Sequence, residues 1–233
     1  MHLNIADGIL WYAVFLFSTV FHEAAHAWSA LKLGDDTASR GGQVSLNPVP
    51  HIKREPFGMV VMPVLTWLLG GWIMGWASAP YDAEWARRFP RRAALMALAG
   101  PAANLTLVVG AALLIRVGIE WHVLTAPHSL GMARVVTAVD AGFWEFVARL
   151  LSIVFSLNLL LCVFNLLPVP PLDGGSLPML ALPEAAARRY FDAMRSPTLQ
   201  IVGFLIVSRG FGTFFPPILR FAALLLYPGS HYR

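Results

Sequence analysis

The residues best suited to chemistry lie at positions 22–26, which read His-Glu-Ala-Ala-His. In a helix, residues four positions apart lie on the same face, so the imidazoles of His22 and His26 can both reach one zinc ion at about 2.0–2.1 Å. Glu23, which is offset from both histidines, can accept a proton from an attacking water molecule. A histidine pair that serves only in helix packing is the alternative, but each polar group in this apolar stretch would then need another partner.

A zinc ion that activates water also needs a third protein ligand and one open position. Asp173 is the candidate, because it follows the apolar run 147–169 and a stretch with three prolines in four positions, residues 168–171. Such prolines break a helix and free backbone groups, which a membrane tolerates only where protein or a water-filled cavity satisfies them. Gly174 and Gly175 let the backbone fold closely around the carboxylate. On the residues alone, a turn in which Asp173 is solvated or caps a helix is an equal alternative.

The composition indicates which elements position these side chains. The chain has 233 residues, of which 57% are hydrophobic and 13% charged, whereas a soluble domain carries about 25% charged residues. Several apolar runs reach the roughly 20 residues that a helix needs to cross a bilayer. We therefore expect an all-α polytopic membrane protein with about five to six membrane-embedded segments, in a single domain over residues 1–233. The apolar runs cover residues 9–21, 57–80, 93–119, 147–169 and 198–227.

The few charged residues support a site inside the membrane. Glu23 is the only carboxylate within a predicted span. A charge at the centre of a membrane costs at least about 2.5 kcal/mol, so such a residue is usually kept for function. The net charge of +4 comes from Arg-rich loops, which in a membrane protein record topology and do not indicate nucleic-acid binding. We expect this chain to lie in a lipid bilayer and to bind no nucleic acid.

The distribution of Lys and Arg predicts the orientation of the chain. Residues 32–56 and 81–92 each contain four of these residues, whereas residues 117–148 contain one. A full crossing by the run 57–80 would place the two richest loops on opposite sides of the membrane, against the positive-inside tendency. We therefore expect 57–80 to form a re-entrant segment, which its glycines and proline favour, with the active site toward the cytoplasmic side. A full crossing is the alternative.

The segment 41–47 has the pattern of a short strand. Its apolar residues Val44 and Leu46 alternate with polar residues, and it lies between Gly-Gly and Asn-Pro turn signals. We expect a short β-hairpin near residues 41–47, whose edge could pair with an unwound peptide by strand addition. A plain connecting loop is the alternative.

Together these motifs resemble the site-2 protease family of intramembrane zinc metalloproteases, in its compact prokaryotic group without PDZ or CBS domains. The resemblance covers nearly the whole chain. It implies one Zn²⁺ ion bound by His22, His26 and Asp173, with Glu23 as the catalytic base. The matching segments are residues 22–26, residues 34–48 with Ser-Leu-Asn-Pro at 45–48, Gly-Trp-Ala at 75–77, Ala-Gly-Pro-Ala-Ala-Asn at 99–104, and residues 165–174.

Two asparagines in these segments are candidates for substrate binding. Asn165 is similar to a family residue that helps to hold the substrate strand or the oxyanion. Asn104 is the second candidate, although an asparagine in a helix of small residues also serves as a hydrogen-bonding group between helices. The resemblance further implies an integral protein of the prokaryotic plasma membrane, whose substrate is a transmembrane segment of another membrane protein.

Two other classes of protein could contain the same polar residues. A transporter or channel tolerates buried His, Glu and Asp, but the chain has no inverted-repeat signal. A membrane scaffold could bind zinc without catalysis, but a structural site has no open position and therefore no use for Glu23. The sequence thus favours an intramembrane protease, and no residue in it indicates an oligomeric state.

Overall fold

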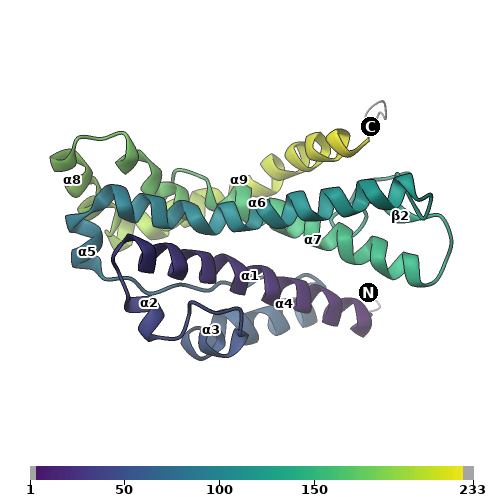
Figure 1. The fold of residues 1–233 in the computed structure, drawn as a ribbon, viewed down its shortest axis with the longest axis horizontal. Coiled ribbons are helices and arrows are strands. Elements are labelled where there is room, and N and C mark those ends of the chain that lie inside the picture. Colours follow the sequence, from purple (N-terminus) through teal and green to yellow (C-terminus); the bar gives the residue numbers. More distant parts are fainter. Residues whose placement is uncertain (1–3, 228–233) are drawn as a thin grey trace.

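A computed structural model describes residues 4–227 of the chain, and most of these residues are helical (Figure 1). Four helices are long and apolar enough to cross a membrane, and a shorter apolar helix covers Phe57–Gly70. The prediction of an all-α polytopic membrane protein is therefore confirmed. The four long helices are α1 (Ile5–Leu33), α6 (Pro90–Glu120), α7 (Phe143–Asn165) and α9 (Pro197–Leu226).

Short elements connect the long helices. Between α1 and α6 lie α2 (Thr37–Arg40), α3 (Pro48–Arg54), a π-helical turn η1 (Phe57–Val61), α4 (Met62–Gly70) and α5 (Ala83–Arg88). Two strands, β1 (Leu124–Thr125) and β2 (Thr137–Ala138), pair in an antiparallel manner in the connection between α6 and α7. A 3₁₀ segment, η2 (Asp173–Leu180), and α8 (Glu184–Met194) lie between α7 and α9.

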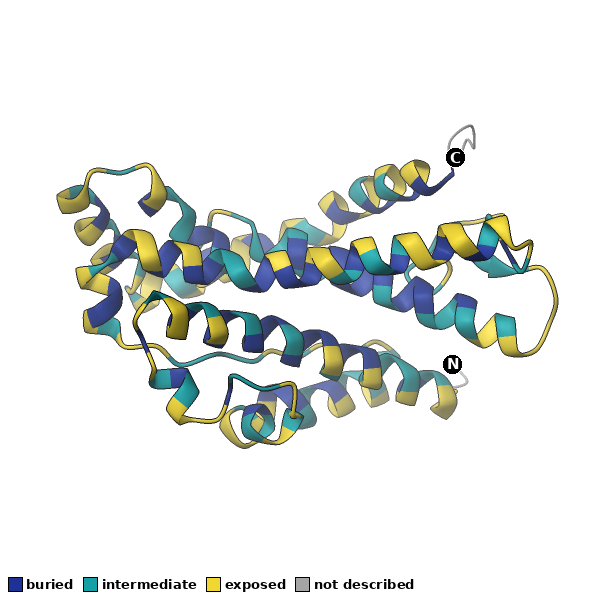
Figure 2. Ribbon diagram, in the orientation of Figure 1, coloured by how far each residue is buried: buried dark blue, intermediate teal, exposed yellow. Residues whose placement is uncertain are grey.

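The long helices pack together along the long axis of the molecule (Figure 1). Val14 and Phe15 of α1 pack against Ile153 and Leu157 of α7, and α6 contacts both of these helices closely. The outward faces carry large exposed side chains, and α9 buries only 17% of its most apolar window (Figure 2). A soluble monomer rarely exposes apolar surface on this scale, so the outer faces fit a lipid solvent. The protein is an integral membrane protein.

The ends of α1 are fixed by caps. The side chain of Asn4 accepts a hydrogen bond from the backbone N–H of Ala6 at 3.1 Å, and Gly34 ends the helix in the left-handed conformation with φ of 106°. Asp35 follows, and its carboxylate accepts hydrogen bonds from Thr37 and from the backbone N–H of Asp82. Burial would raise the pKa of Asp35, but these hydrogen bonds outweigh it and hold the pKa below its usual value. Asp35 thus ties the end of α1 to the start of α5.

The apolar run 57–80 folds back on itself. Its helix ends at Gly70, Gly71 takes a left-handed conformation with φ of 69°, and the chain returns without helix. The N–H of Trp76 donates to the carbonyl of Gly58 at 3.1 Å, and Arg54 donates to the carbonyl of Ser78 at 3.1 Å. The residues before the run and those at its end therefore lie next to each other. This reversal is what a re-entrant segment requires, and its side of the membrane stays a prediction.

The β-hairpin predicted near residues 41–47 is wrong. These residues form turns and bends, because the N–H of Gln43 bonds back to the carbonyl of Ala38 and Gly42 has a φ of 74°. The side chain of Asn47 accepts a hydrogen bond from the N–H of Val49 and caps α3. Residues at both ends of the segment thus form hydrogen bonds with the ends of α2 and α3, and the segment does not form the paired hydrogen bonds of a strand. Within residues 4–227 the one strand pair is β1–β2.

Candidate metal centre

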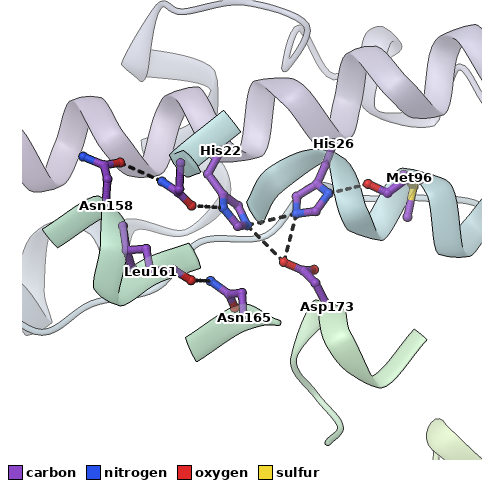
Figure 3. A network of polar contacts seen from close by, with 8 residues as sticks. His22, His26, Met96, Asn158, Leu161, Asn165 and Asp173 are labelled. Carbon is purple, nitrogen blue, oxygen red and sulfur yellow. Dashed lines mark hydrogen bonds and ion pairs between the residues drawn. The ribbon is translucent and has the colours of Figure 1, made fainter. Parts of the chain in front are cut away.

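Three side chains meet at one point between α1 and η2 (Figure 3). The Nε2 atoms of His22 and His26 lie 2.9 Å apart, and Oδ2 of Asp173 lies 3.2 Å from the first and 3.3 Å from the second. Both histidines are only 6% exposed. The helical spacing of four residues brings the imidazoles together, as the sequence predicted. The long-range partner that could not be chosen from the residues alone, Asp173, lies beside them.

The Asp173 side chain is placed by a tight turn after α7. The N–H of Leu172 donates to the carbonyl of Val169, and the N–H of Gly175 donates to the carbonyl of Leu172. A Cβ atom at Gly174 would lie 2.3 Å from the carbonyl oxygen of Leu166, so only glycine allows the turn to close against the end of α7. The proline-rich stretch therefore ends the helix and returns the carboxylate toward α1.

This arrangement fits a zinc ion. Ligand atoms at about 2.0–2.1 Å from a tetrahedral zinc lie about 3.3 Å from one another, close to the distances between Asp173 and the two histidines. Oδ2 of Asp173 is buried and receives no hydrogen bond from the described residues. Nδ1 of His26 lies 2.8 Å from the carbonyl oxygen of Met96, which can only accept, so the neutral imidazole carries its proton there and presents a bare Nε2 to the centre. Oδ2 of Asp173 and Nε2 of His26 are thus both acceptor atoms that face the same point. A positive charge between them would offset their repulsion.

Gly100 of α6 forms the wall of the centre. A Cβ atom at this position would lie 2.3 Å from Nε2 of His26 and 2.4 Å from Nε2 of His22. Real Cβ atoms essentially never approach other atoms so closely. The space next to the two nitrogens, where a metal ion would bind, therefore exists only because residue 100 is glycine.

We expect Gly100→Ala to weaken zinc binding by at least tenfold, because the added methyl group displaces the imidazoles from the geometry that zinc requires. Zinc affinity of the purified protein, measured by competition with a chelator, checks this. Gly110→Ala is the matched control, since it lies on the same helix and an added Cβ there meets no atom within 4 Å. Equal zinc affinity in the Gly100→Ala variant and the parent would place the metal elsewhere.

Glu23 lies on the same helix turn as the histidines and is 6% exposed. It contributes no atom to the three-residue cluster of possible metal ligands. Within residues 4–227, no hydrogen-bond donor to its carboxylate is recorded in the structure. A buried carboxylate beside the ligands, and without a fixed donor, has the position and the free acceptor atoms that a general base needs.

The two asparagines predicted to bind substrate take different positions. Oδ1 of Asn104, on α6, lies 2.5 Å from Nδ1 of His22. This amide therefore contacts the ring nitrogen of His22 that does not face the metal centre. Its position agrees with the alternative interpretation, a hydrogen-bonding group between helices. Asn165, at the end of α7, donates to the carbonyl of Leu161 in its own helix at 3.0 Å (Figure 3). A substrate contact by Asn165 stays a prediction.

The sequence interpretation missed two buried groups near the centre. Asn158 of α7 bonds to Asn104, and Ser18 of α1 bonds to Asn158; both are fully buried. The asparagine in the middle of the apolar run 147–169, Asn158, was a usable signal, because an amide in a membrane helix is costly without a partner. The carbonyl of Met96 has no signal in the sequence, since every residue has one.

Comparison with known proteins identifies the family of this chain. Peptidase family M50 matches residues 11–208. A Bacillus subtilis (strain 168) protein named "Putative zinc metalloprotease YwhC" is 36% identical over 160 residues, which cover 68% of this chain and 63% of that protein. Proteins named Rip2, with the same description, are 33% identical over 167 residues in Mycolicibacterium smegmatis and 32% identical over 162 residues in Mycobacterium tuberculosis.

These matches cover 71% and 70% of this chain but only 54% and 53% of the Rip2 proteins, so the chain matches less than two thirds of the length of each of these relatives. No solved structure matches the chain significantly. The family match nevertheless covers both histidines, Glu23 and Asp173. The resemblance that the motifs indicated is thus confirmed, and the chain belongs to Peptidase family M50.

Proposed function

We propose that this protein is an intramembrane zinc metalloprotease that hydrolyses peptide bonds within or next to the transmembrane segments of other membrane proteins. The observation that carries the proposal is the convergence of His22, His26 and Asp173 on one point. The two histidines lie on α1, which is long and apolar enough to cross a membrane. The zinc metalloprotease names of the relatives support the same activity.

The residues of this chain have separate roles in the proposed reaction. A zinc ion held by His22, His26 and Asp173 would act as a Lewis acid on the scissile carbonyl and activate a water molecule. Glu23 accepts the proton of that water and later passes it to the leaving amine, so the peptide bond is replaced by a carboxylate and an amine. The carbonyl of Met96 holds Nδ1 of His26 and keeps its Nε2 directed at the metal.

The substrate in this proposal is a transmembrane segment that unwinds before cleavage. A helix hides its amides in its own hydrogen bonds, so a carbonyl becomes accessible only where the helix has opened. Asn165 is the candidate that holds the unwound strand. It lies where α7 ends and the turn to Asp173 begins, and its amide oxygen, which the bond to Leu161 leaves unused, can accept a substrate N–H.

A peptidase assay tests this function against the other two classes. The purified full chain in detergent, given an unstructured peptide, should cleave it, lose the activity on chelation and regain it when zinc is added. A transporter or channel should show no cleavage, and a zinc-binding scaffold should bind zinc without cleavage. Either of these two results would overturn the proposal.

We also propose that the protein lies in a prokaryotic plasma membrane with its active site toward the cytoplasm. The segments before and after the run 57–80, which are rich in Lys and Arg, contact each other through Asp35 and Asp82 and through Arg54 and Ser78. Segments in contact favour one side of the membrane, and the positive-inside tendency assigns that side to the cytoplasm. The four long helices then run alternately inward and outward, beginning with α1 running inward.

This topology predicts the result of cysteine labelling. In a Cys162→Ala background, cysteines at Ser39 and Glu84 should both react with an impermeant reagent only from the cytoplasmic side, whereas a cysteine at Ser129 should react from outside. Labelling in oriented vesicles, before and after permeabilisation, measures this. If positions 39 and 84 react from opposite sides, the run 57–80 crosses the membrane and the proposed orientation is wrong.

A further inference from the structure

We propose that Asn158 is a positioning residue of the metal centre, which acts on His22 through Asn104. The proposal rests on the proposed zinc site. Nδ2 of Asn158 donates to the carbonyl of Val154 at 2.8 Å, and its Oδ1 accepts from Nδ2 of Asn104 at 2.8 Å. Oδ1 of Asn104 then lies 2.5 Å from Nδ1 of His22. A relay of two amides thus joins α7 to the metal ligand on α1.

The direction of this relay is fixed by the backbone of α7. The carbonyl of Val154 can only accept, so the Asn158 amide must turn its N–H toward that carbonyl and its oxygen toward Asn104. Asn104 must therefore donate to Asn158, which turns its own oxygen toward His22. The only group on Nδ1 of His22 that satisfies this oxygen is an N–H. The neutral imidazole of His22 consequently carries its proton on Nδ1 and presents a bare Nε2 to the metal.

Burial makes the relay specific. Asn104, Asn158 and Ser18 are all 0% exposed, so water does not compete for their hydrogen bonds. Ser18 accepts a second hydrogen bond from Nδ2 of Asn158 at 2.9 Å. The Asn158 amide therefore also contacts α1. If Asn158 is lost, Asn104 has an unsatisfied N–H and no group that fixes which end of its amide faces His22. The ligand then has no fixed tautomer or orientation.

Zinc affinity of the purified full chain tests the relay without an activity measurement. Asn158→Leu, which keeps the side-chain volume and removes both polar atoms, should weaken zinc binding by about 10- to 100-fold, as loss of an outer partner of a metal ligand usually does. Ser156→Ala is the matched control. Ser156 is also fully buried on α7, but its hydroxyl donates to the carbonyl of Met132, outside the relay, and this variant should bind zinc like the parent.

A double-mutant cycle separates the relay from general packing. If Asn158 acts through Asn104, then Asn158→Leu should cause no further loss of zinc affinity in an Asn104→Leu background. Equal losses in both backgrounds would overturn the proposal, and so would parent-like affinity in Asn158→Leu. Asn158→Thr provides a second variant if the leucine variant does not fold. Its hydroxyl can still donate to Val154 but cannot reach Asn104, so the same loss is expected.

The Nδ1–H of His22 gives a second readout, in the zinc-loaded protein. NMR of protein with ¹⁵N-labelled histidine, with Asn104→Leu to assign the signal, should show an Nδ1 proton that exchanges slowly with solvent in the parent and faster in Asn158→Leu, because the bond to Asn104 holds this proton. An unchanged exchange rate would overturn the relay. A parent protein that binds zinc and shows the slowly exchanging proton but cleaves no peptide would instead contradict the proposed metalloprotease while supporting the relay, so the two failures are distinguishable.

Discussion

Replacing Glu23 with glutamine should abolish peptide cleavage while the protein still binds about one zinc ion. The amide has nearly the same shape as the carboxylate but cannot accept the proton of the attacking water. General base catalysis contributes about 10²- to 10⁴-fold to a rate, so the loss should be at least a hundredfold. All three candidate ligands remain, and Glu23 is not one of them. Metal analysis and a peptidase assay on the same preparation measure both results.

Asp7→Asn is the matched control for this substitution. Asp7 is a carboxylate on the same helix, but its Oδ2 pairs with Arg149 at 2.7 Å, far along α1 from the histidines. This variant should keep its zinc and its cleavage rate. If Glu23→Gln cleaves at nearly the parent rate, another group is the base. If it loses the metal, Glu23 contributes to the binding of the ion, and the proposed division of roles is wrong.

The local part of the site could be predicted from the sequence because it depends only on helix geometry. His22 and His26 lie four residues apart in one helix, and this spacing alone places both imidazoles on one face. The position of Asp173 could not be predicted in this way. Its carboxylate lies beside the histidines only because a turn closes where Gly174 packs against Leu166. The proline-rich pattern predicted a break in the helix but did not determine the direction in which the carboxylate would return.

The rest of the site depends on contacts between helices that no local pattern encodes. Asn104 lies in a motif that suggested a substrate contact, yet it faces His22, because the register of α6 against α1 decides what the amide meets. Asn158 was read only as part of an apolar run, and its role follows from the packing of α7 against α6. Gly100 likewise has a function only through its distance from the two imidazoles.

The predicted hairpin failed for a different reason. The alternation of apolar and polar residues in 41–47 matched a strand. This pattern does not show which backbone groups already form hydrogen bonds elsewhere. Gln43 and Asn47 serve the ends of two short helices. In contrast, the reversal within the run 57–80 was predictable from charge, because two basic loops on opposite sides of a membrane are unfavourable whatever the local structure.

Replacing Asp173 with alanine should remove zinc binding and activity together. The two imidazole nitrogens remain 2.9 Å apart, but without the carboxylate the centre loses its only negative ligand and its third coordination position. Zinc affinity should fall by at least a hundredfold, to a level at which the purified protein carries little metal. Asn165→Ala is the comparison within the same region, since Asn165 bonds to Leu161 and not to a ligand, and it should keep the metal.

Thermal unfolding adds a measurement that does not depend on a substrate. A ligand that binds only the folded state stabilises it in proportion to the logarithm of its concentration over its dissociation constant. The unfolding midpoint of the parent, and of Asn165→Ala, should therefore fall when a chelator is added. The midpoint of Asp173→Ala should be the same with and without the chelator, because this variant has no bound zinc to lose. A chelator-dependent midpoint in Asp173→Ala would show that the third ligand lies elsewhere in the chain.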